Sequence, residues 1–507
     1  MRLKDLLSGV ETKSFPQVLE NEEASDIKID HRDVQKGDVF IALKGEKHNG
    51  NDYALQVLEK GAVCVVSEED LENEKCVKVD NSRRAYAIMS KHYFHDACDK
   101  LRLVAVTGTN GKTTTVNTIA SLLQMAGAKV GVIGTLGTNF NGKNIDTGFT
   151  TPDPYALHKL LEEMKSDGVE FVAMEASAHA LALDKLEGIN FEIGVLTNIT
   201  EDHLDYFKDM DSYAQAKFKL FENGRVKMGI VCGGKEYCDQ LISSAQVPII
   251  SYGIGQEYDV SGKDVIKTFE NSQFVCDYLG EQIPIKTPLV GGYNIENALA
   301  SVAVVRSLGI DSKLIKLGMN CLVPVEGRFN VISMNGQNII IDFAHTPDGL
   351  EKVLKTAKEL TSGKLVVVFG CGGNRDRKKR PIMGKIASSL ADEVVLTSDN
   401  PRDEEPMEII QEIKAGIDGK CVIEPTRKKA IEQTLKAFEP GRTIVIAGKG
   451  AEKYQEIKGR KYPYNDFDVV YNFYRRNIKP VDNLTKTDEH LQKICKNNDF
   501  DEENDIN

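Results

Sequence analysis

The segment VAVTGTNGKTTTVNTIA at residues 104–120 decides the fold of this chain. An apolar run leads into Gly108 and Gly111, which let backbone N–H groups approach phosphate oxygens without a Cβ in the way. A helix that begins directly after them turns its positive end toward the same anion. The usual phosphate-binding loop has its first glycine where this chain has Val106. The segment therefore predicts a compact phosphate-binding loop between a strand and a helix.

The residues after the second glycine fit a nucleotide triphosphate. Lys112 would neutralise charge on the β- and γ-phosphates, and the hydroxyl of Thr113 could coordinate Mg²⁺. Val116, Ile119 and Leu123 fall on one face of the expected helix. An ordinary glycine turn before a helix is the alternative, and the Lys-Thr-Thr run disfavours it.

The composition excludes several function classes. A length of 507 residues predicts about three domains. The net charge of -12 disfavours nucleic acid or an anionic membrane as the main partner, although a local basic pocket for a small anion stays open. No apolar run is long enough to span a bilayer, and the N-terminal segment lacks the apolar core of a signal peptide. The ten cysteines form no CxxC pair, which predicts reduced thiols in a cytoplasmic protein without zinc or disulfides.

The chain is predicted to be an α/β protein of three domains. Residues 1–99 alternate short apolar runs with polar turns, which predicts a small N-terminal α/β domain. Residues 100–327 alternate β-branched runs with helical segments, so we expect a central domain with a parallel sheet. Residues 328–480 repeat that pattern, which predicts a Rossmann-like domain covered on both faces, with ligands beyond the carboxyl ends of its strands. Residues 481–507 are acidic and polar, and are predicted to be disordered.

Two polar segments follow strands of the central block. Glu175 ends an apolar strand, which is unfavourable for a carboxylate unless a metal or another cation meets it. A helix-capping or salt-bridged glutamate is the alternative. The segment LTNITEDHLDYF at residues 196–207 places His203 at the next outlet, either as a metal ligand or as an ordinary loop histidine.

Lys217 lies in a predicted helix, SYAQAKFKLF at residues 212–221, with apolar neighbours. If the side chain is buried, its lowered pKa would let the neutral amine take up CO₂. The resulting carbamate is an anion that could hold Mg²⁺. A surface lysine is the alternative that the spacing alone would favour.

Together these segments resemble the Mur ligase family, over nearly the whole chain up to about residue 480. The resemblance rests on VTGTNGKTTT, TTPDP, MEASAHAL, TNITEDHLDYF, YAQAK, GGYNIENALAS, GRF, IDFAHTPDGL, GCGGNRDRKKRP, SDNPRDEEP and AGKGAEKYQ. The compact loop is the form that this family uses. The resemblance implies an ATP-dependent amide ligase of peptidoglycan precursor synthesis that acts on small molecules as a monomer.

The resemblance also implies roles for the nucleotide site. The residues that would hold the ATP phosphates are Gly108, Thr109, Asn110, Gly111, Lys112, Thr113 and Thr114. Thr113 and Glu175 would serve one Mg²⁺, and His203 with a carbamylated Lys217 would serve a second. Lys112, Glu175, His203 and Lys217 are thus the expected catalytic residues. Asn294 and Asn297 would lie near the adenine, and Arg328, Asp342 and His345 would close over the nucleotide from the third domain.

The acceptor implied by the resemblance is UDP-MurNAc-L-Ala-D-Glu. Residues 29–31 and 46–48, including Ile29 and His31, would contact its uridine end. Its other contacts would be Thr150, Thr151, Ser177 and Lys185. The D-Glu carboxylate would attack the γ-phosphate of ATP to give an acyl phosphate, which the amine of an incoming amino acid then attacks.

The loop SDNPR predicts which amino acid is added. Arg402 can bind a carboxylate bidentately, and family members that use meso-diaminopimelate have the same Asp-Asn-Pro-Arg. Diaminopimelate carries a second carboxylate at the end of its side chain, whereas lysine does not. The expected contacts to the amino acid are Arg375, Asp399, Asn400, Pro401, Arg402, Gly448 and Glu452, with Glu452 suited to the distal ammonium. The alternative for Arg375 is a solvated basic loop.

The chain departs from the family's patterns at several positions. Ala451 replaces a histidine, and His31 stands where a serine would contact the nucleotide. Phe149 replaces an asparagine, and Lys185 replaces an arginine. These departures bear on the acceptor contacts and on amino-acid choice, and none removes a charge needed for phosphoryl transfer.

Other functions stay open. Within the ligase class, the added residue could be L-lysine or another diamino acid, and more remotely the reaction could resemble that of folylpolyglutamate synthetase. A P-loop ATPase of switch or motor type would need a conventionally spaced loop. A non-catalytic relative that binds wall precursors would not need Lys112, Glu175, His203, Lys217 and Arg328 together.

Overall fold

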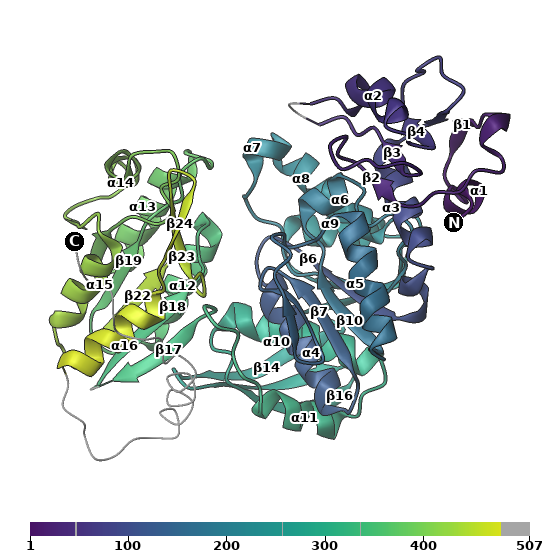
Figure 1. Cartoon of the computed structure of the whole chain (residues 1–507). Helices are drawn as coiled ribbons and strands as arrows, with labels where there is room; N and C mark the ends of the chain where they lie inside the picture. The colour runs from purple at the N-terminus through teal and green to yellow at the C-terminus, as the bar shows by residue number, and fades with distance from the viewer. Residues whose placement is uncertain (46–47, 256, 335, 478–507) are drawn as a thin grey trace.

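The computed structural model describes residues 1–477 other than 46–47, 256 and 335, so the predictions for residues 46–47 and 481–507 lie outside the described residues. Three sheets of five, eleven and six strands follow one another along the chain, and a two-stranded hairpin comes last. The predicted α/β fold is confirmed. Figure 1 shows the first and third sheets on different sides of the second.

The N-terminal sheet has the order β1-β5-β4-β3-β2 and is parallel except at β1. Its strands are β1 Thr12–Ser14, β2 Ile27–Lys28, β3 Val39–Ile41, β4 Cys64–Ser67 and β5 Cys76–Val79. Its helices are α1 Leu3–Leu6, α2 Ala54–Glu59 and α3 Ser82–Tyr93. The apolar runs DVFIAL, AVCVV and KCVKVD of this segment form β3, β4 and β5, all of them largely buried.

The central sheet has the order β16-β15-β14-β13-β12-β11-β6-β10-β7-β8-β9. The strands are β6 Arg102–Thr107, β7 Val130–Gly134, β8 Gly137–Phe140, β9 Lys143–Ile145, β10 Phe171–Glu175, β11 Phe191–Leu196, β12 Val226–Cys232, β13 Ile249–Ile254, β14 Val260–Lys267, β15 Ser272–Tyr278 and β16 Glu281–Thr287. The run from β14 to β7 is parallel, as predicted. Antiparallel hairpins extend both edges, which the sequence analysis did not predict.

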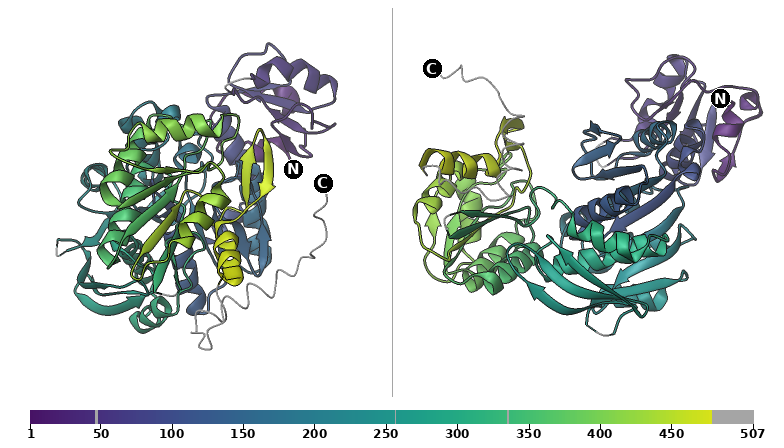
Figure 2. Two further views of the ribbon diagram at one scale, coloured as in Figure 1. Left: turned by 90° about the vertical axis from the view of Figure 1, so that its left-hand side faces the viewer. Right: turned by 90° about the horizontal axis from the view of Figure 1, so that it is seen from below.

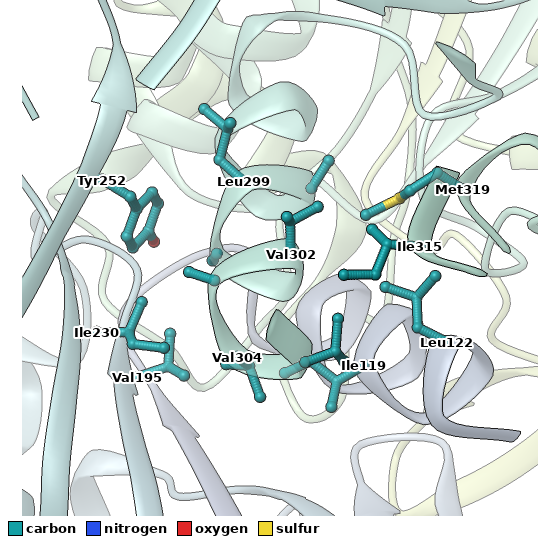
Figure 3. Close-up of a cluster of buried hydrophobic side chains, with 14 of the residues drawn as sticks. Ile119, Leu122, Val195, Ile230, Tyr252, Leu299, Val302, Val304, Ile315 and Met319 are labelled. Atoms are coloured by element: carbon teal, nitrogen blue, oxygen red, sulfur yellow. The ribbon is translucent and has the colours of Figure 1, made fainter. Parts of the chain in front are cut away.

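Helix α10 contributes many side chains to a large cluster of buried hydrophobic residues in this domain (Figure 3). The central helices are α4 Lys112–Met125, α5 Pro154–Ser166, α6 Ala178–Ala182, α7 Leu204–Phe207, α8 Met210–Phe218, α9 Glu236–Ser244, α10 Gly292–Ser307 and α11 Ser312–Asn320. Leu299, Val302 and Val304 of α10 are fully buried in one cluster with sheet residues and with Ile119 of α4 and Ile315 of α11. A helix buried on nearly every side is apolar all round, which explains the run NALASVAVV. This packing fixes α4, and with it the phosphate loop.

The C-terminal sheet has the order β17-β18-β22-β19-β20-β21, parallel except for β17. Its strands are β17 Asn330–Met334, β18 Gln337–Asp342, β19 Leu365–Phe369, β20 Glu393–Leu396, β21 Val422–Ile423 and β22 Thr443–Ala447. The helices are α12 Pro347–Leu360, α13 Lys379–Leu390, α14 Pro406–Lys414, α15 Arg427–Lys436 and α16 Asp466–Asn477, and the hairpin is β23 Tyr454–Ile457 with β24 Arg460–Pro463.

Both faces of this sheet are covered, as predicted. Ile340 of β18 packs with α12, α13 and α14, whereas Ile339 and Ile341 pack with α15 and α16. The alternation follows from the period of two along a strand. Within the described ranges, no helix has the length and apolar character needed to cross a membrane.

Contacts join the three bodies near the ends of the central strands. On the N-terminal side, Tyr155 donates to Asp26 at 2.7 Å and Tyr86 donates to Asp153 at 2.9 Å. On the C-terminal side, the amide of Asn110 donates to Asp348 at 2.8 Å. The phosphate loop is therefore in direct contact with the third body, whose separate position is seen best in the second view of Figure 2.

Candidate active site

The loop after β6 has the backbone that the sequence predicted. Gly108 and Gly111 have φ angles of 145° and 88°, which a side chain would disfavour. A Cβ at Gly108 would lie 1.9 Å from Thr197 Oγ1, and one at Gly111 would lie 2.4 Å from Asn297 Oδ1. The N–H groups of Thr109 and Asn110 donate to Asn198, at 2.9 and 3.0 Å. Close packing against the end of β11 thus fixes the loop.

Two lysines converge on the carbonyl of Gly108. Lys112 Nζ donates to it at 2.8 Å and Lys217 Nζ donates to it at 2.9 Å. Burial lowers the pKa of Lys112. Burial and the neighbouring Lys112 lower the pKa of Lys217 well below its usual value. Lys217 is fully buried in α8, above the ring of Tyr213 at 4.2 Å, so a surface lysine is excluded.

Thr113 and Glu175 form a pair of oxygen donors under the loop. Thr113 Oγ1 donates to Glu175 Oε1 at 2.9 Å, and Glu175 is buried at the end of β10. The N–H of Thr135 donates to the same Oε1 at 2.9 Å, and the hydroxyl of Thr135 donates to Oε2 at 3.1 Å. Thr114 is buried beside Thr113 in the first turn of α4. Hard oxygen atoms of this kind suit Mg²⁺, which keeps its other positions for water and phosphate oxygens.

His203 lies near the loop in a strained conformation. Its φ is 56°, and its Nε2 lies 3.4 Å from Asp202 Oδ2. Burial lowers its pKa to about 4, so the imidazole is neutral and able to bind a metal. His203 and Lys217 flank the same ring, that of Tyr213. Among the residues that the structure describes, no cluster of three or more His, Cys, Asp or Glu could hold a metal by itself.

The two asparagines of YNIENA lie in the first turns of α10. Asn297 packs against Gly111, and its amide donates to Asn294 Oδ1 at 3.1 Å. Asn294 Nδ2 donates to the carbonyl of Val290 at 2.9 Å. Both side chains are buried, so their arrangement also holds the start of α10 against the phosphate loop.

The C-terminal domain contains three residues that the sequence analysis predicted to close over the nucleotide. Arg328 Nη2 donates to Thr113 Oγ1 at 3.3 Å, and its guanidinium lies 4.5 Å from the ring centre of Phe343. Asp342 accepts the N–H of Phe329 and of Ala344, both at 2.7 Å, and burial raises its pKa to about 6. His345 follows at the start of the loop to α12, and burial lowers its pKa.

The predicted acceptor contacts lie beside Glu175. Thr150 Oγ1 lies 3.1 Å from Thr135 Oγ1, while Thr151 donates to the carbonyl of Glu175 at 2.8 Å. Ser177 caps α6, with its hydroxyl accepting the N–H of Ala180 at 3.2 Å. These residues share one neighbourhood at the ends of β7 and β10.

Two of the unusual residues of this chain touch each other. The ammonium of Lys185 lies 5.2 Å from the ring centre of Phe149, which is 63% exposed. In the N-terminal domain, the imidazole of His31 is stacked on the ring of Tyr53, with centroids 3.7 Å apart. Ile29 beside it is exposed. The His31–Tyr53 stack was not predicted.

A second group of predicted residues lies beyond the strands of the C-terminal sheet. Arg375 and Arg402 meet at Gly372, where a Cβ would be 3.8 Å from Arg375 Cγ and 3.0 Å from Arg402 Nη1. A Cβ at Gly373 would lie 1.9 Å from the carbonyl oxygen of Pro401. Arg375 is exposed and has no recorded ion pair with any described residue.

Two carboxylate side chains, those of Asp399 and Glu452, belong to the same group of predicted residues. Asp399 is buried, its Oδ1 accepts the N–H of Asn400 at 2.6 Å, and its Oδ2 has no hydrogen-bond partner within the described part of the chain. A Cβ at Gly448 would lie 2.5 Å from that Oδ2. Glu452 Oε2 accepts Lys449 Nζ at 2.7 Å and Asn400 Nδ2 at 2.9 Å. The group therefore offers two arginines and one unpaired, buried carboxylate oxygen to a ligand.

Three family models match the chain in the same order. They are "Mur ligase family, catalytic domain" at residues 23–98, "Mur ligase middle domain" at residues 106–305, and "Mur ligase, glutamate ligase domain" at residues 327–450. A Clostridium tetani protein, "UDP-N-acetylmuramoyl-L-alanyl-D-glutamate--2,6-diaminopimelate ligase", is 37% identical over 480 residues, which is 93% of this chain and 98% of that protein. An Aquifex aeolicus protein of the same name is 39% identical over 447 residues, or 88% and 92% of the two chains. The chain belongs to the Mur ligase family.

A solved structure agrees with this assignment. A structure titled "UDP-N-acetylmuramoyl-L-alanyl-D-glutamate--2, 6-diaminopimelate ligase" superimposes on this Mur ligase with a TM-score of 0.70 at 32% identity, covering 95% of this chain and all of that one. Members of the family are ATP-dependent peptide ligases, and so is this chain.

The Mur ligase site also contains residues that sequence reasoning missed. Thr135 orients Glu175, Asp348 binds the loop residue Asn110, and Tyr213 lies under Lys217. Tyr213 stands four residues before Lys217 in one helix, a spacing that could have indicated the contact. The other partners are distant in sequence, and no local signal marks them.

Proposed function

We propose that this Mur ligase joins diaminopimelate to the D-Glu carboxylate of UDP-MurNAc-L-Ala-D-Glu at the expense of ATP. It would do so as a monomer in the cytoplasm, on small-molecule substrates alone. The proposal extends the family assignment to one substrate set, and the names of the relatives from Clostridium tetani and Aquifex aeolicus support it.

The observation behind the choice of amino acid is the charge pattern beyond the C-terminal strands. Arg375 and Arg402 meet at Gly372, and the unpaired Oδ2 of Asp399 lies against Gly448. A buried carboxylate oxygen without a partner costs free energy until a donor arrives, and a ligand ammonium is such a donor. Diaminopimelate has a carboxylate and an ammonium at each end, whereas lysine would bring a distal ammonium toward cationic arginines.

The nucleotide would lie on the loop at Gly108 to Thr114. When bound, Mg²⁺ supplies positive charge to the phosphate oxygens. Thr113 and Glu175 fit one such ion, since both present buried oxygen atoms 2.9 Å apart. Lys112 would leave its carbonyl partners for the phosphates, and Arg328 would add a second cation from the C-terminal domain.

A second ion would need a modified Lys217. An amine offers a metal no anionic oxygen, but a carbamate does, and the burial that lowers the pKa of Lys217 keeps its amine neutral and nucleophilic toward CO₂. His203, whose ring also contacts that of Tyr213, would complete the pair of protein ligands. We infer this carbamate from the burial and from the neighbouring Lys112.

The reaction would then follow from the charges in place. The D-Glu carboxylate attacks the γ-phosphate and ADP leaves, with Lys112 and Arg328 offsetting the anionic charge that the two reactants bring together. The free amine of diaminopimelate attacks the acyl phosphate carbon, an amide forms, and phosphate leaves. The contacts of Arg328 and Asp348 with the loop would keep the C-terminal domain over the intermediate and exclude water.

Phosphate release tests the proposal. The purified protein would receive ATP, Mg²⁺ and UDP-MurNAc-L-Ala-D-Glu, with diaminopimelate or L-lysine added in parallel. We expect release that needs both the acceptor and diaminopimelate. Release that ignores both would favour the ATPase alternative and overturn the proposal.

A further inference from the structure

The arginine that would bind the distal carboxylate is itself held by the hairpin β23–β24. The N–H of Arg402 donates to the carbonyl of Glu456 at 3.1 Å, and the carbonyl of Arg402 accepts the N–H of Lys458 at 2.8 Å. These bonds make a short parallel bridge between Arg402 and Ile457. The φ of Arg402 is 51°, so its backbone needs support from its surroundings. The loop after β20 and the hairpin therefore form one unit.

The side chains are paired as well. Arg402 Nε donates to Glu456 Oε2 at 3.0 Å, and Arg402 Nη1 donates to the carbonyl of Gly373 at 2.8 Å. The two side chains are 21% and 26% exposed. Within the part of the chain that the structure describes, Nη2 has no hydrogen-bond partner. The end of the guanidinium therefore keeps free N–H groups while its Nε and one N–H of Nη1 are engaged.

Two opposite roles for Glu456 follow from this contact. A carboxylate on a binding arginine could compete with the ligand for it, or it could fix the arginine for the ligand. Glu456 accepts from Nε, which leaves the N–H groups of Nη2 and the second N–H of Nη1 available to a ligand carboxylate. Fixing a long side chain before binding also removes an entropic cost from binding.

We propose that Glu456 is a positioning residue, which aims Arg402 at the distal carboxylate of the incoming amino acid. The inference rests on the proposed function, because it takes diaminopimelate as the amino acid. Glu456 thereby becomes a determinant of amino-acid choice that lies outside the loop with the Asp-Asn-Pro-Arg sequence. Its effect would be confined to amino acids that carry an acidic group at the end of the side chain.

The test compares two alanine variants of glutamates that both pair with a cation at this contact. Glu456→Ala removes the partner of Arg402. Glu405→Ala removes the partner of Lys458, an exposed ion pair of 3.4 Å in the same hairpin contact, and leaves Arg402 untouched. For both variants and the wild type, KM and kcat would be measured with diaminopimelate, with ATP and with L-lysine as a weak alternative substrate.

We expect Glu456→Ala to raise the KM for diaminopimelate about 10-fold. Its KM for ATP and its kcat/KM for L-lysine should stay near the wild-type values, and Glu456→Gln, which keeps an acceptor oxygen, should recover part of the loss. Glu405→Ala should match the wild type. A fall in KM would establish competition, and an unchanged KM in an active enzyme would overturn the inference alone. A wild type that did not use diaminopimelate would overturn the proposed function and this role with it.

Discussion

Arg328 at the entrance to the C-terminal domain lies 3.3 Å from the hydroxyl of Thr113 at the start of α4. The two residues are 215 positions apart, and their contact places a cation from one domain over the phosphate loop of another. The proposed nucleotide site would therefore be formed jointly by the central and C-terminal domains.

Arg328→Ala should lower kcat/KM for ATP by about 100-fold, because a cation aimed at the phosphates would be lost from a partly buried site. Steady-state phosphate release checks this value. Arg306→Ala is a matched control, since Arg306 pairs with Glu281 at the edge of the central sheet, away from the loop. Equal losses in the two variants would argue against a role for Arg328 in the nucleotide site.

Lys217→Ala should abolish ligation, and short carboxylates such as formate or acetate should restore part of it by supplying the missing anion. Depleting CO₂ from the wild-type buffer should lower the rate, and bicarbonate should restore it. Lys219→Ala, which removes a lysine paired with Asp184, should show no such rescue. Full activity of Lys217→Ala would contradict the carbamate.

Arg402→Lys should raise the KM for diaminopimelate about 10-fold or more, because lysine keeps the charge but cannot bind a carboxylate with two parallel N–H groups. The KM for ATP should stay nearly the same. Initial rates at varied diaminopimelate check both values. An unaltered KM for diaminopimelate would remove Arg402 from the amino-acid site.

We expect His158 in α5 to account for part of the fall in the free energy of unfolding at acidic pH. Its ring nitrogens are buried without hydrogen-bond partners among the described residues, and burial lowers its pKa to about 3. In the unfolded chain, His158 takes up a proton near pH 6.5. The contribution of its neutral form to the free energy of unfolding is therefore present in full above that pH and is lost as the pH falls toward 3. Between pH 7 and pH 5, the free energy of unfolding should fall less in His158→Leu than in the wild type, by about 1–2 kcal/mol.

Urea unfolding at the two pH values measures this difference. His95→Asn is the control, because His95 is exposed and its φ of 57° suits asparagine. The control should keep the wild-type pH dependence. Parallel pH curves for the wild type and His158→Leu would show that His158 is not the group responsible.

The phosphate loop could be predicted from sequence because its signals are local. Gly108, Gly111, Lys112 and Thr113 stand within six residues, and the apolar spacing after them predicted the buried face of α4. The carboxyl ends of parallel strands meet at one edge of a sheet, so Glu175 could be expected near that loop. The antiparallel edge strands were missed because their short hairpins lack the strand-helix alternation on which the domain prediction relied.

The contacts between residues that are distant in sequence could not be predicted in this way. Asp348 binds Asn110 across 238 residues, and Glu456 binds Arg402 across 54. Such pairs depend on how distant segments pack, and no local pattern indicates that Asp348 binds Asn110 or that Glu456 binds Arg402. The stacking of His31 on Tyr53 and of Lys185 on Phe149 likewise needed the fold, although the sequence had marked three of these four residues as departures.

The measurement that tests the central claim most directly is a competition between amino acids. The enzyme would be given ATP, Mg²⁺ and UDP-MurNAc-L-Ala-D-Glu with equal amounts of meso-diaminopimelate and L-lysine, and the product would be identified by mass. We predict that nearly all of the product contains diaminopimelate. A product that contains mainly lysine would contradict the assignment of Arg375, Asp399 and Arg402 to an amino acid with a distal carboxylate.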